Sequence, residues 1–88
     1  MSRATTNDPL ALALRALAAT LADQRLAERF LSLSGIDPPD LRQRAADPAL
    51  LVALLQFLEA HEPDLVAVAE EIGAKPEALV AARRELEQ

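Results

Sequence analysis

The stretch DPALLVALLQFLEAH, from Asp47 to His61, decides the fold of this chain. Asp47 is a residue type that caps helices well, and Pro48 is the residue best tolerated at the first helical position. The apolar residues that follow cover almost the whole circumference of the predicted helix: Leu50, Leu51, Val52, Leu54, Leu55, Phe57 and Leu58. A helix that is apolar on nearly every side belongs inside a core, with other elements packed around it. We therefore expect this helix to lie at the centre of the domain.

The rest of the chain predicts further helices and no strands. Proline precedes or opens five of the six predicted helices, which begin near Pro9, Gln24, Pro38 or Pro39, Pro48, Glu62 and Pro76. Gly35 and Gly73 end two of them in the left-handed conformation that a Cβ disfavours. No segment alternates apolar and polar residues with period two. The sequence therefore predicts an all-α fold, a single compact bundle of five or six short helices.

Length and composition limit the chain to one small domain. Its 88 residues suffice for one core, and that core has to be aliphatic because Phe30 and Phe57 are the only aromatic residues. The chain has no cysteine, which excludes disulfides, thiolate metal sites and thiol nucleophiles. We expect residues 8–88 to form a single helical domain and residues 1–7 to be a disordered N-terminal tail.

Two apolar segments were compared with a secretory signal and with a membrane-spanning helix, and neither fits. The run from Leu10 to Ala22 is preceded by Asp8 and Pro9 and interrupted by Arg15, which is atypical of a secretory signal. The longest uncharged stretch around the central helix, Pro48 to Leu58, is too short to cross a bilayer. We expect a cytoplasmic protein that does not bind membranes.

The first predicted helix carries more apolar surface than one neighbour needs. One stripe at helical spacing is expected to face the core, and consists of Leu10, Leu14, Leu17 and Leu21. Another side is rich in small residues, and we interpret it as a candidate interaction surface for a protein partner or a homodimer, formed by Leu12, Ala16 and Ala19. The alternative is that the helix is sandwiched within its own domain, so that both sides belong to the core.

The two halves of the sequence resemble each other. Asp8 and Pro9 lie 39 positions before Asp47 and Pro48, and the pattern G-x-x-P-x-x-L at Gly35 recurs 38 positions later. A three-helix unit that occurs twice explains these matches. The alternative is chance, because helical chains rich in leucine and alanine match themselves easily.

The net charge of −5 is unevenly distributed. Residues 1–47 carry six arginines and six acidic residues, whereas residues 48–88 carry three basic and eight acidic residues. An acidic half repels phosphate backbones and anionic lipid headgroups. We therefore do not expect nucleic acid as a partner, and interpret most of the charge as a solvated face.

One segment nevertheless resembles a DNA-binding motif. Residues 65–86 have the pattern of a helix–turn–helix, with Gly73 in the turn and Leu79 anchoring the second helix. A reading helix offers Arg, Lys, Asn, Gln or Ser to base edges. This helix offers Glu77, Val80, Ala81, Glu85 and Glu87, with Arg83 and Arg84 to oppose them. Because the pattern fits but the side chains do not suit DNA, a DNA-associated regulator is the alternative function and not the leading one.

No catalytic or metal-binding constellation can be assembled from these residues. His61 is the only histidine, and it lies at the expected C-terminal end of the central helix, where the dipole favours a protonated imidazole. A lone histidine makes a poor zinc site or catalytic centre. The carboxylate pairs fall at predicted helix ends or exposed faces, and comprise Asp37 with Asp40, Glu62 with Asp64, and Glu70 with Glu71. We predict no enzyme activity, no cofactor and no metal site.

Several segments together resemble a known family. They are LALRALA from Leu12, RFLSLSGIDPPDLR from Arg29, ADPALLVALLQFL from Ala46 and PEALVAARREL from Pro76. Over nearly its whole length the chain resembles a family of short, all-helical alphaproteobacterial proteins of unknown function. It departs from the family at Leu50, where an aromatic residue is usual, and at Gln24, where an acidic residue or proline is usual. The resemblance implies a fold and no activity, cofactor or catalytic residue.

These observations favour a non-catalytic protein–protein interaction module. The composition excludes several chemistries, and apolar helical faces are the feature that the sequence has in excess. We expect a protein partner or a second copy of the chain to cover such a face.

Overall fold

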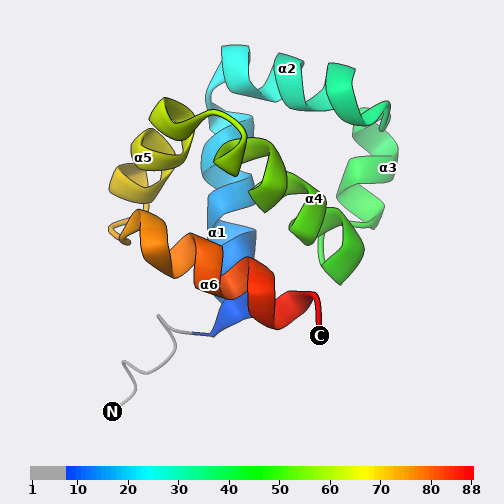
Figure 1. Cartoon of the computed structure of the whole chain (residues 1–88). Helices are drawn as coiled ribbons and strands as arrows, with labels where there is room; N and C mark the ends of the chain where they lie inside the picture. Colours follow the sequence, from blue (N-terminus) through cyan, green and yellow to red (C-terminus); the bar gives the residue numbers. More distant parts are fainter. Residues whose placement is uncertain (1–7) are drawn as a thin grey trace.

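The computed structural model describes residues 8–88, so the predicted tail over residues 1–7 lies outside the described residues. Residues 8–88 form six helices and no strands, which confirms the predicted all-α bundle. Figure 1 shows the helices in chain order. They are α1 (Pro9–Ala22), α2 (Gln24–Ser34), α3 (Pro38–Gln43), α4 (Pro48–Glu59), α5 (Glu62–Glu71) and α6 (Pro76–Leu86).

Aspartate side chains cap three of the six helices. Asp8 and Asp47 each accept a hydrogen bond from the backbone N–H two residues further on, at 3.1 and 2.9 Å. Proline follows each of these two caps at the start of the helix. Asp23 caps α2 by accepting from the N–H groups of Arg25 and Leu26. Each cap satisfies N–H groups that a helix leaves unpaired and is worth about 1 kcal/mol.

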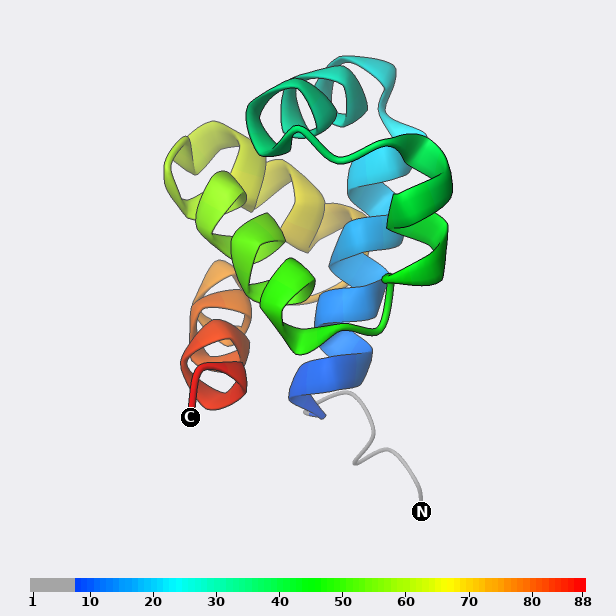
Figure 2. The same ribbon diagram turned by 90° about the vertical axis from the view of Figure 1, so that its right-hand side faces the viewer.

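α4 is the central helix, as its composition predicts. Five of its leucines are at most 2% exposed, namely Leu50, Leu51, Leu54, Leu55 and Leu58. α4 packs closely on α1, α5 and α6, and less closely on α2. Figures 1 and 2 show α4 lying against α1, with α2 across one end of this pair and α6 near the other. Because burying one leucine contributes about 1.5–3 kcal/mol, α4 accounts for a large part of the hydrophobic stabilisation.

α1 is buried on two sides, which corrects the expected interaction surface. Leu12 is 4% exposed and Ala16 is 0% exposed, and Ala19 is half-buried. The physical reason is close packing. Leu12 lies beside alanines of α6, and Ala19 lies across from Val68 of α5. The helix is thus sandwiched within its own domain, the alternative that the sequence left open.

The exposed leucines of α1 belong to the stripe that we expected to face the core. Leu10 and Leu21, at the two ends of that stripe, are 37% and 36% exposed. Leu17, in the middle of the stripe, is 4% exposed, as expected. The prediction was therefore wrong about the ends of the stripe, because the neighbouring helices do not cover the whole length of α1.

Both glycines adopt the conformation expected of them. Gly35 has a φ of +71° and Gly73 a φ of +72°, in the left-handed region that side chains with a Cβ rarely enter. Gly35 ends α2 and donates its N–H to the carbonyl of Leu31 at 2.9 Å. Gly73 follows the end of α5 and leads to α6. The shared left-handed φ agrees with the internal repeat, although Gly73 donates its N–H to a carbonyl three residues back and Gly35 to one four residues back.

The two three-helix units are nevertheless packed differently. In the second unit α4, α5 and α6 all pack closely on one another. In the first unit α1 and α2 pack closely, but α3 packs closely on no other helix of the described chain. α3 has 6 residues, whereas α6, its counterpart, has 11. The first unit is therefore open on the side of α3.

Within residues 8–88, none of the helices has the length and apolar character needed to cross a membrane.

Candidate functional site

An apolar groove lies in the open part of the first unit. It has a volume of 360 Å³ and lies between α1, α2 and the segment that contains α3. We name it the α1–α2–α3 groove, and its lining residues are Leu17, Leu21, Ala27, Leu31, Pro38, Leu41, Arg42 and Ala45. Figure 1 shows these helices along three sides of a frame, with α2 connecting α1 to α3.

The local sequence explains why the groove stays open. The chain turns at Gly35, and a pair of prolines then begins α3. Leu41 is the only buried residue of α3, at 5% exposed. A helix with one buried side chain covers little of its neighbours, so Leu21 stays 36% exposed and Leu31 stays half-buried. A ligand that covers these side chains would gain roughly 25 cal/mol for each Å² of apolar surface removed from water.

Arg42 is the charged residue in the wall of the groove. No ion pair among residues 8–88 includes it. Four other arginines have partners, since Arg15 donates to the carbonyl of Ile72 and Arg29, Arg44 and Arg83 pair with carboxylates. Among residues 8–88, Arg25 and Arg84 resemble Arg42 in that no ion pair includes them. The groove thus combines an apolar wall with one guanidinium that has no carboxylate partner in this part of the chain.

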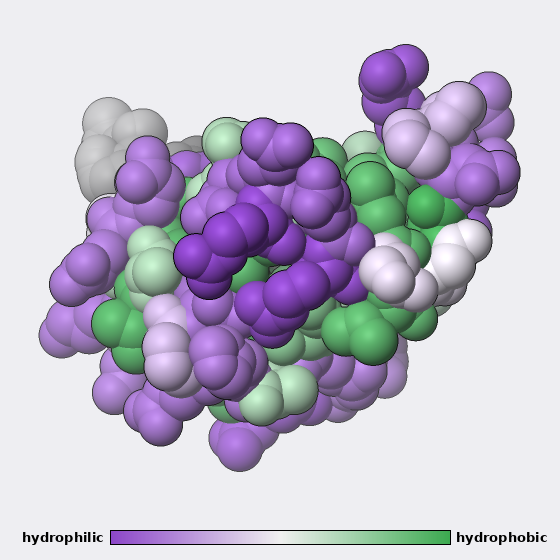
Figure 3. All heavy atoms as spheres, turned by 90° about the horizontal axis from the view of Figure 1, so that it is seen from above, coloured by the Kyte–Doolittle hydropathy of each residue, from purple (hydrophilic) through white to green (hydrophobic). Residues whose placement is uncertain are grey.

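A second apolar hollow lies on the other side of α2, facing α4. It has a volume of 300 Å³ and is lined by Phe30, Leu33, Ser34, Ala53, Gln56, Phe57 and Ala60. The rings of Phe30 and Phe57 lie 5.4 Å apart at the base of this hollow. Leu33 is 75% exposed, although its helical spacing from Leu26 and Phe30 would place it on the buried stripe of α2. Figure 3 shows hydrophobic surface beside the polar residues that cover α2.

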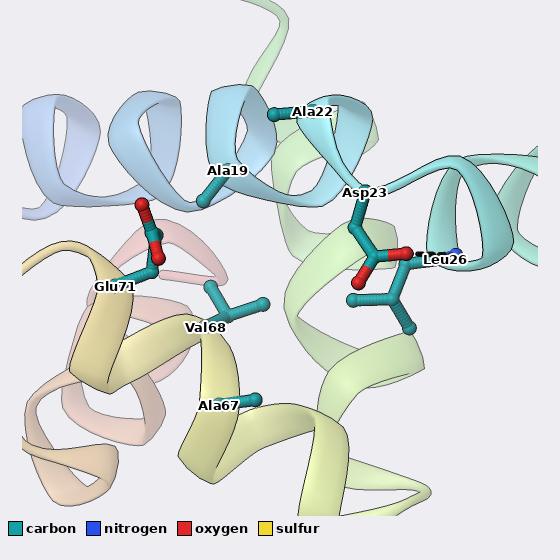
Figure 4. Close-up of a pocket in the computed structure, with 7 residues that line it drawn as sticks. All are labelled: Ala19, Ala22, Asp23, Leu26, Ala67, Val68 and Glu71. Atoms are coloured by element: carbon teal, nitrogen blue, oxygen red, sulfur yellow. Dashed lines mark hydrogen bonds between the residues drawn. The ribbon is translucent and has the colours of Figure 1, made fainter.

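A third pocket, between the α1–α2 junction and α5, has an acidic rim (Figure 4). Its volume is 320 Å³, and it is lined by Ala19, Ala22, Asp23, Leu26, Ala67, Val68 and Glu71. The carboxylate of Asp23 is already engaged in capping α2, as the dashed line to the backbone of Leu26 shows. The candidate residue Ala19 contributes one methyl group to this pocket, apart from Leu12 and Ala16 in the core.

The single histidine takes part in an ion-pair cluster that joins α2 to α5. The Oδ2 atom of Asp64 lies 2.9 Å from the Nδ1 atom of His61 and 2.9 Å from a guanidinium nitrogen of Arg29. The guanidinium of Arg29 also lies 5.3 Å from the centre of the Phe57 ring, at cation–π distance. His61 lies after α4, as predicted. Its ring is held by the carboxylate of Asp64 and not by the dipole of α4 alone.

The environment of Asp64 favours its charged form. Burial raises the pKa of this carboxyl group, but the close contacts with His61 and Arg29 lower the pKa by more, so that it lies below the ordinary value of 3.8. The two contacts meet on one buried oxygen and lack the geometry of ordinary hydrogen bonds, so we describe them as ion pairs.

The part of the chain that the structure describes contains no group of three His, Cys, Asp or Glu residues placed to hold a metal ion. The carboxylate of Asp64 contacts the guanidinium of Arg29 and the imidazole of His61, which links α2 to the start of α5.

The candidate DNA-reading helix α6 is tied to α4 by one ion pair. The Nε atom of Arg83 lies 2.6 Å from a carboxylate oxygen of Glu59, and its Nη1 atom lies 3.0 Å from Glu87. The hydrogen bonds to Glu59 and then Glu87 raise the pKa of Arg83 above its ordinary value. Leu79 is 0% exposed and anchors α6, as predicted. Of the two arginines that could oppose the acidic residues of α6, Arg83 is thus occupied within the fold.

Sequence reasoning did not find the residues that line the α1–α2–α3 groove. A signal was present, because the segment from Pro38 to Gln43 offers a single leucine as an inward residue. A helix that short and that polar cannot cover two apolar neighbours.

Comparison with protein-family models matches residues 6–88 to DUF3572, which is described as a protein of unknown function. Comparisons with curated proteins and with solved structures give no match.

Proposed function

We propose that this chain, which belongs to the DUF3572 family, is a non-catalytic protein-interaction module that binds its partner in the α1–α2–α3 groove. One observation carries the proposal: α3 leaves a 360 Å³ groove open in which Leu21 and Leu31 remain accessible. An apolar hollow with few polar groups in its wall is a typical place for a partner to bind.

The DNA-associated alternative has one feature in its favour. α5 and α6 pack on each other and are joined through the turn at Gly73, an arrangement compatible with a helix–turn–helix. Against it, Arg83 is paired with carboxylates and the outward residues of α6 are mainly acidic. DNA binding depends on cations that neutralise phosphates, so this alternative receives less support.

A capture experiment with two matched variants tests the proposal. Leu21→Lys places a charge at the edge of the groove, and Val66→Lys places the same charge on α5. The two parent side chains are almost equally exposed, at 36% and 37%, so both variants are expected to fold. Immobilised parent protein and both variants are incubated with lysate of the native host, and bound proteins are identified.

We expect the parent and Val66→Lys to retain the same proteins and Leu21→Lys to lose them. Retention of the same proteins by all three forms would show that the groove is not the binding surface. Circular dichroism of each variant verifies that a loss is not caused by unfolding.

A further inference from the structure

A surface segment that contains α3 connects α2 to α4. It consists of residues 36–46, and we name it the α3 strap. Gly35 precedes it with a left-handed φ of +71°, and Asp47 follows it as the cap of α4. Figure 2 shows α3 joined to α2 and to α4 by two non-helical connections. The strap can therefore move without a change in either neighbouring helix.

The polar contacts of the strap are all local. Within residues 8–88, its hydrogen bonds stay between residues 34 and 47, and those of Leu41 and Arg44 run from the N–H to the carbonyl four residues back, at 2.9 Å. Its ion pair joins Arg44 to Asp47 at 3.7 Å, at the end of the strap. The side chain of Asp37 does not cap α3, unlike the aspartates that cap α1, α2 and α4. These contacts stabilise turns of the strap itself and do not hold it on the rest of the domain.

Apolar contacts hold the strap in place, and they are few. Leu41 is 5% exposed, and Ile36 and Ala45 are half-buried against the core. The remaining residues of the strap are exposed, namely Asp37, Pro38, Pro39, Asp40, Arg42, Gln43, Arg44 and Ala46. The strap thus depends on one buried leucine, whereas α4 buries five.

A segment of this kind opens more easily than the core. Regions with few buried apolar contacts and exposed backbone hydrogen bonds open locally at a low free energy, whereas core helices open only when the whole domain unfolds. A detached helix of 6 residues has no stability of its own, because helix nucleation is costly. Release of Leu41 and loss of α3 should therefore occur together.

We propose that the α3 strap opens as a unit in the native protein, with Leu41 as its anchor, while α1, α2, α4, α5 and α6 stay folded. Opening enlarges the accessible part of α1 and α2, where Leu17 and Leu31 line the groove together with Leu41. The strap is thus a flap that determines how much of the groove wall is accessible. This inference goes beyond the proposed function and does not depend on it, because it concerns the chain alone.

Native-state hydrogen exchange, followed by NMR at several low urea concentrations, tests the proposal. The amide of Arg44, which donates to the carbonyl of Asp40, reports on the strap, and the amide of Leu58 reports on α4. In the parent we expect both amides to be protected, with a protection factor at least about 100-fold lower for Arg44. The exchange of Arg44 should depend little on urea, because opening of the strap exposes little surface, whereas that of Leu58 should accelerate steeply.

Two leucine-to-alanine variants separate opening of the strap from global unfolding. Leu41→Ala should lower the protection of Arg44 and Leu58 alike, by about tenfold or more, because it weakens the closed form relative to every open form. Leu79→Ala is the matched control, since Leu79 is 0% exposed on α6, which does not pack closely on α3. It should lower the protection of Leu58 by a similar factor and leave that of Arg44 unchanged, because α6 is folded whether the strap is closed or open.

Three results would overturn the inference. Equal protection and equal urea dependence of Arg44 and Leu58 in the parent would show that the strap opens only with the whole domain. An equal loss of protection at both amides in Leu79→Ala would show the same. A lack of protection at Arg44 in the parent would show that the strap is not closed in solution. The parent alone supplies the first and third results, so the test stands even if a variant does not fold. Capture can be insensitive to Leu21→Lys without any change in these exchange rates, so the proposed function and the strap are tested separately.

Discussion

Leu54 and Leu33 test the packing described here, because the same substitution should have very different costs at the two positions. Leu54 on α4 is 0% exposed, whereas Leu33 on α2 is 75% exposed. Leu54→Ala removes buried methyl groups and leaves a cavity, at a cost of about 2–5 kcal/mol. Leu33→Ala loses less than a quarter of the roughly 1.5–3 kcal/mol that full burial would contribute, because alanine keeps the Cβ, so the cost is roughly 0.5 kcal/mol or less.

The cost of Leu54→Ala is a large fraction of the total free energy of unfolding, and the cost of Leu33→Ala is a small one. A chain of 88 residues is expected to have a free energy of unfolding of about 4–13 kcal/mol, at roughly 0.05–0.15 kcal/mol per residue. Thermal unfolding followed by circular dichroism should therefore show a fall in Tm of about 10–40 °C for Leu54→Ala and of at most about 4 °C for Leu33→Ala. Similar shifts for the two variants would refute the assignment of α4 as the central helix and of Leu33 as a surface residue.

Three further predictions follow from the turns, the ion pairs and the surface charge. Gly35→Val and Gly73→Val should each lower the free energy of unfolding by about 1–2 kcal/mol in urea titrations, because each places a Cβ on a left-handed backbone. A clash is not the cause, since apart from the glycine and its chain neighbours no heavy atom lies within 4 Å of the added Cβ. An unchanged midpoint at one site would contradict a shared requirement for glycine at the two turns. Folding lowers the pKa of Asp64, so the stability that this carboxylate contributes is present above its ordinary pKa of 3.8 and is lost as pH falls through the lower folded value. Stability measured as a function of pH should therefore fall less steeply in acid for Asp64→Asn than for the parent. Parallel curves for the two proteins would contradict this role of Asp64. The protein should not bind labelled duplex DNA in an anisotropy titration. Binding that weakens steeply between about 50 and 200 mM salt, as counterion release requires, would instead support the DNA-associated regulator.

The elements of the fold could be predicted because their determinants are local. The caps at Asp8 and Asp47, the prolines that follow them and the glycines at 35 and 73 act over two to four residues. The apolar circumference of α4 is a property of one helix, so its burial follows from its own sequence.

The candidate site could not be predicted, because it depends on which helices are neighbours. Periodicity showed that α1 has apolar residues on two sides, but it did not show that α6 would cover Leu12 while Leu21 would stay exposed. The contact between His61 and Asp64 spans three residues and was within reach of the sequence. The contact between Arg29 and Asp64 spans 35 positions and depends on how α2 lies on α5.

The central claim is that the α1–α2–α3 groove is where a partner protein binds, and site-specific photocrosslinking in the native host tests it most directly. A photoreactive amino acid replaces Arg42 in the groove in one variant and Arg84 on α6 in the other, both of them exposed positions. The account predicts a discrete crosslinked product from position 42 after illumination and none from position 84. A product from position 84 alone, or equal products from both positions, would contradict it.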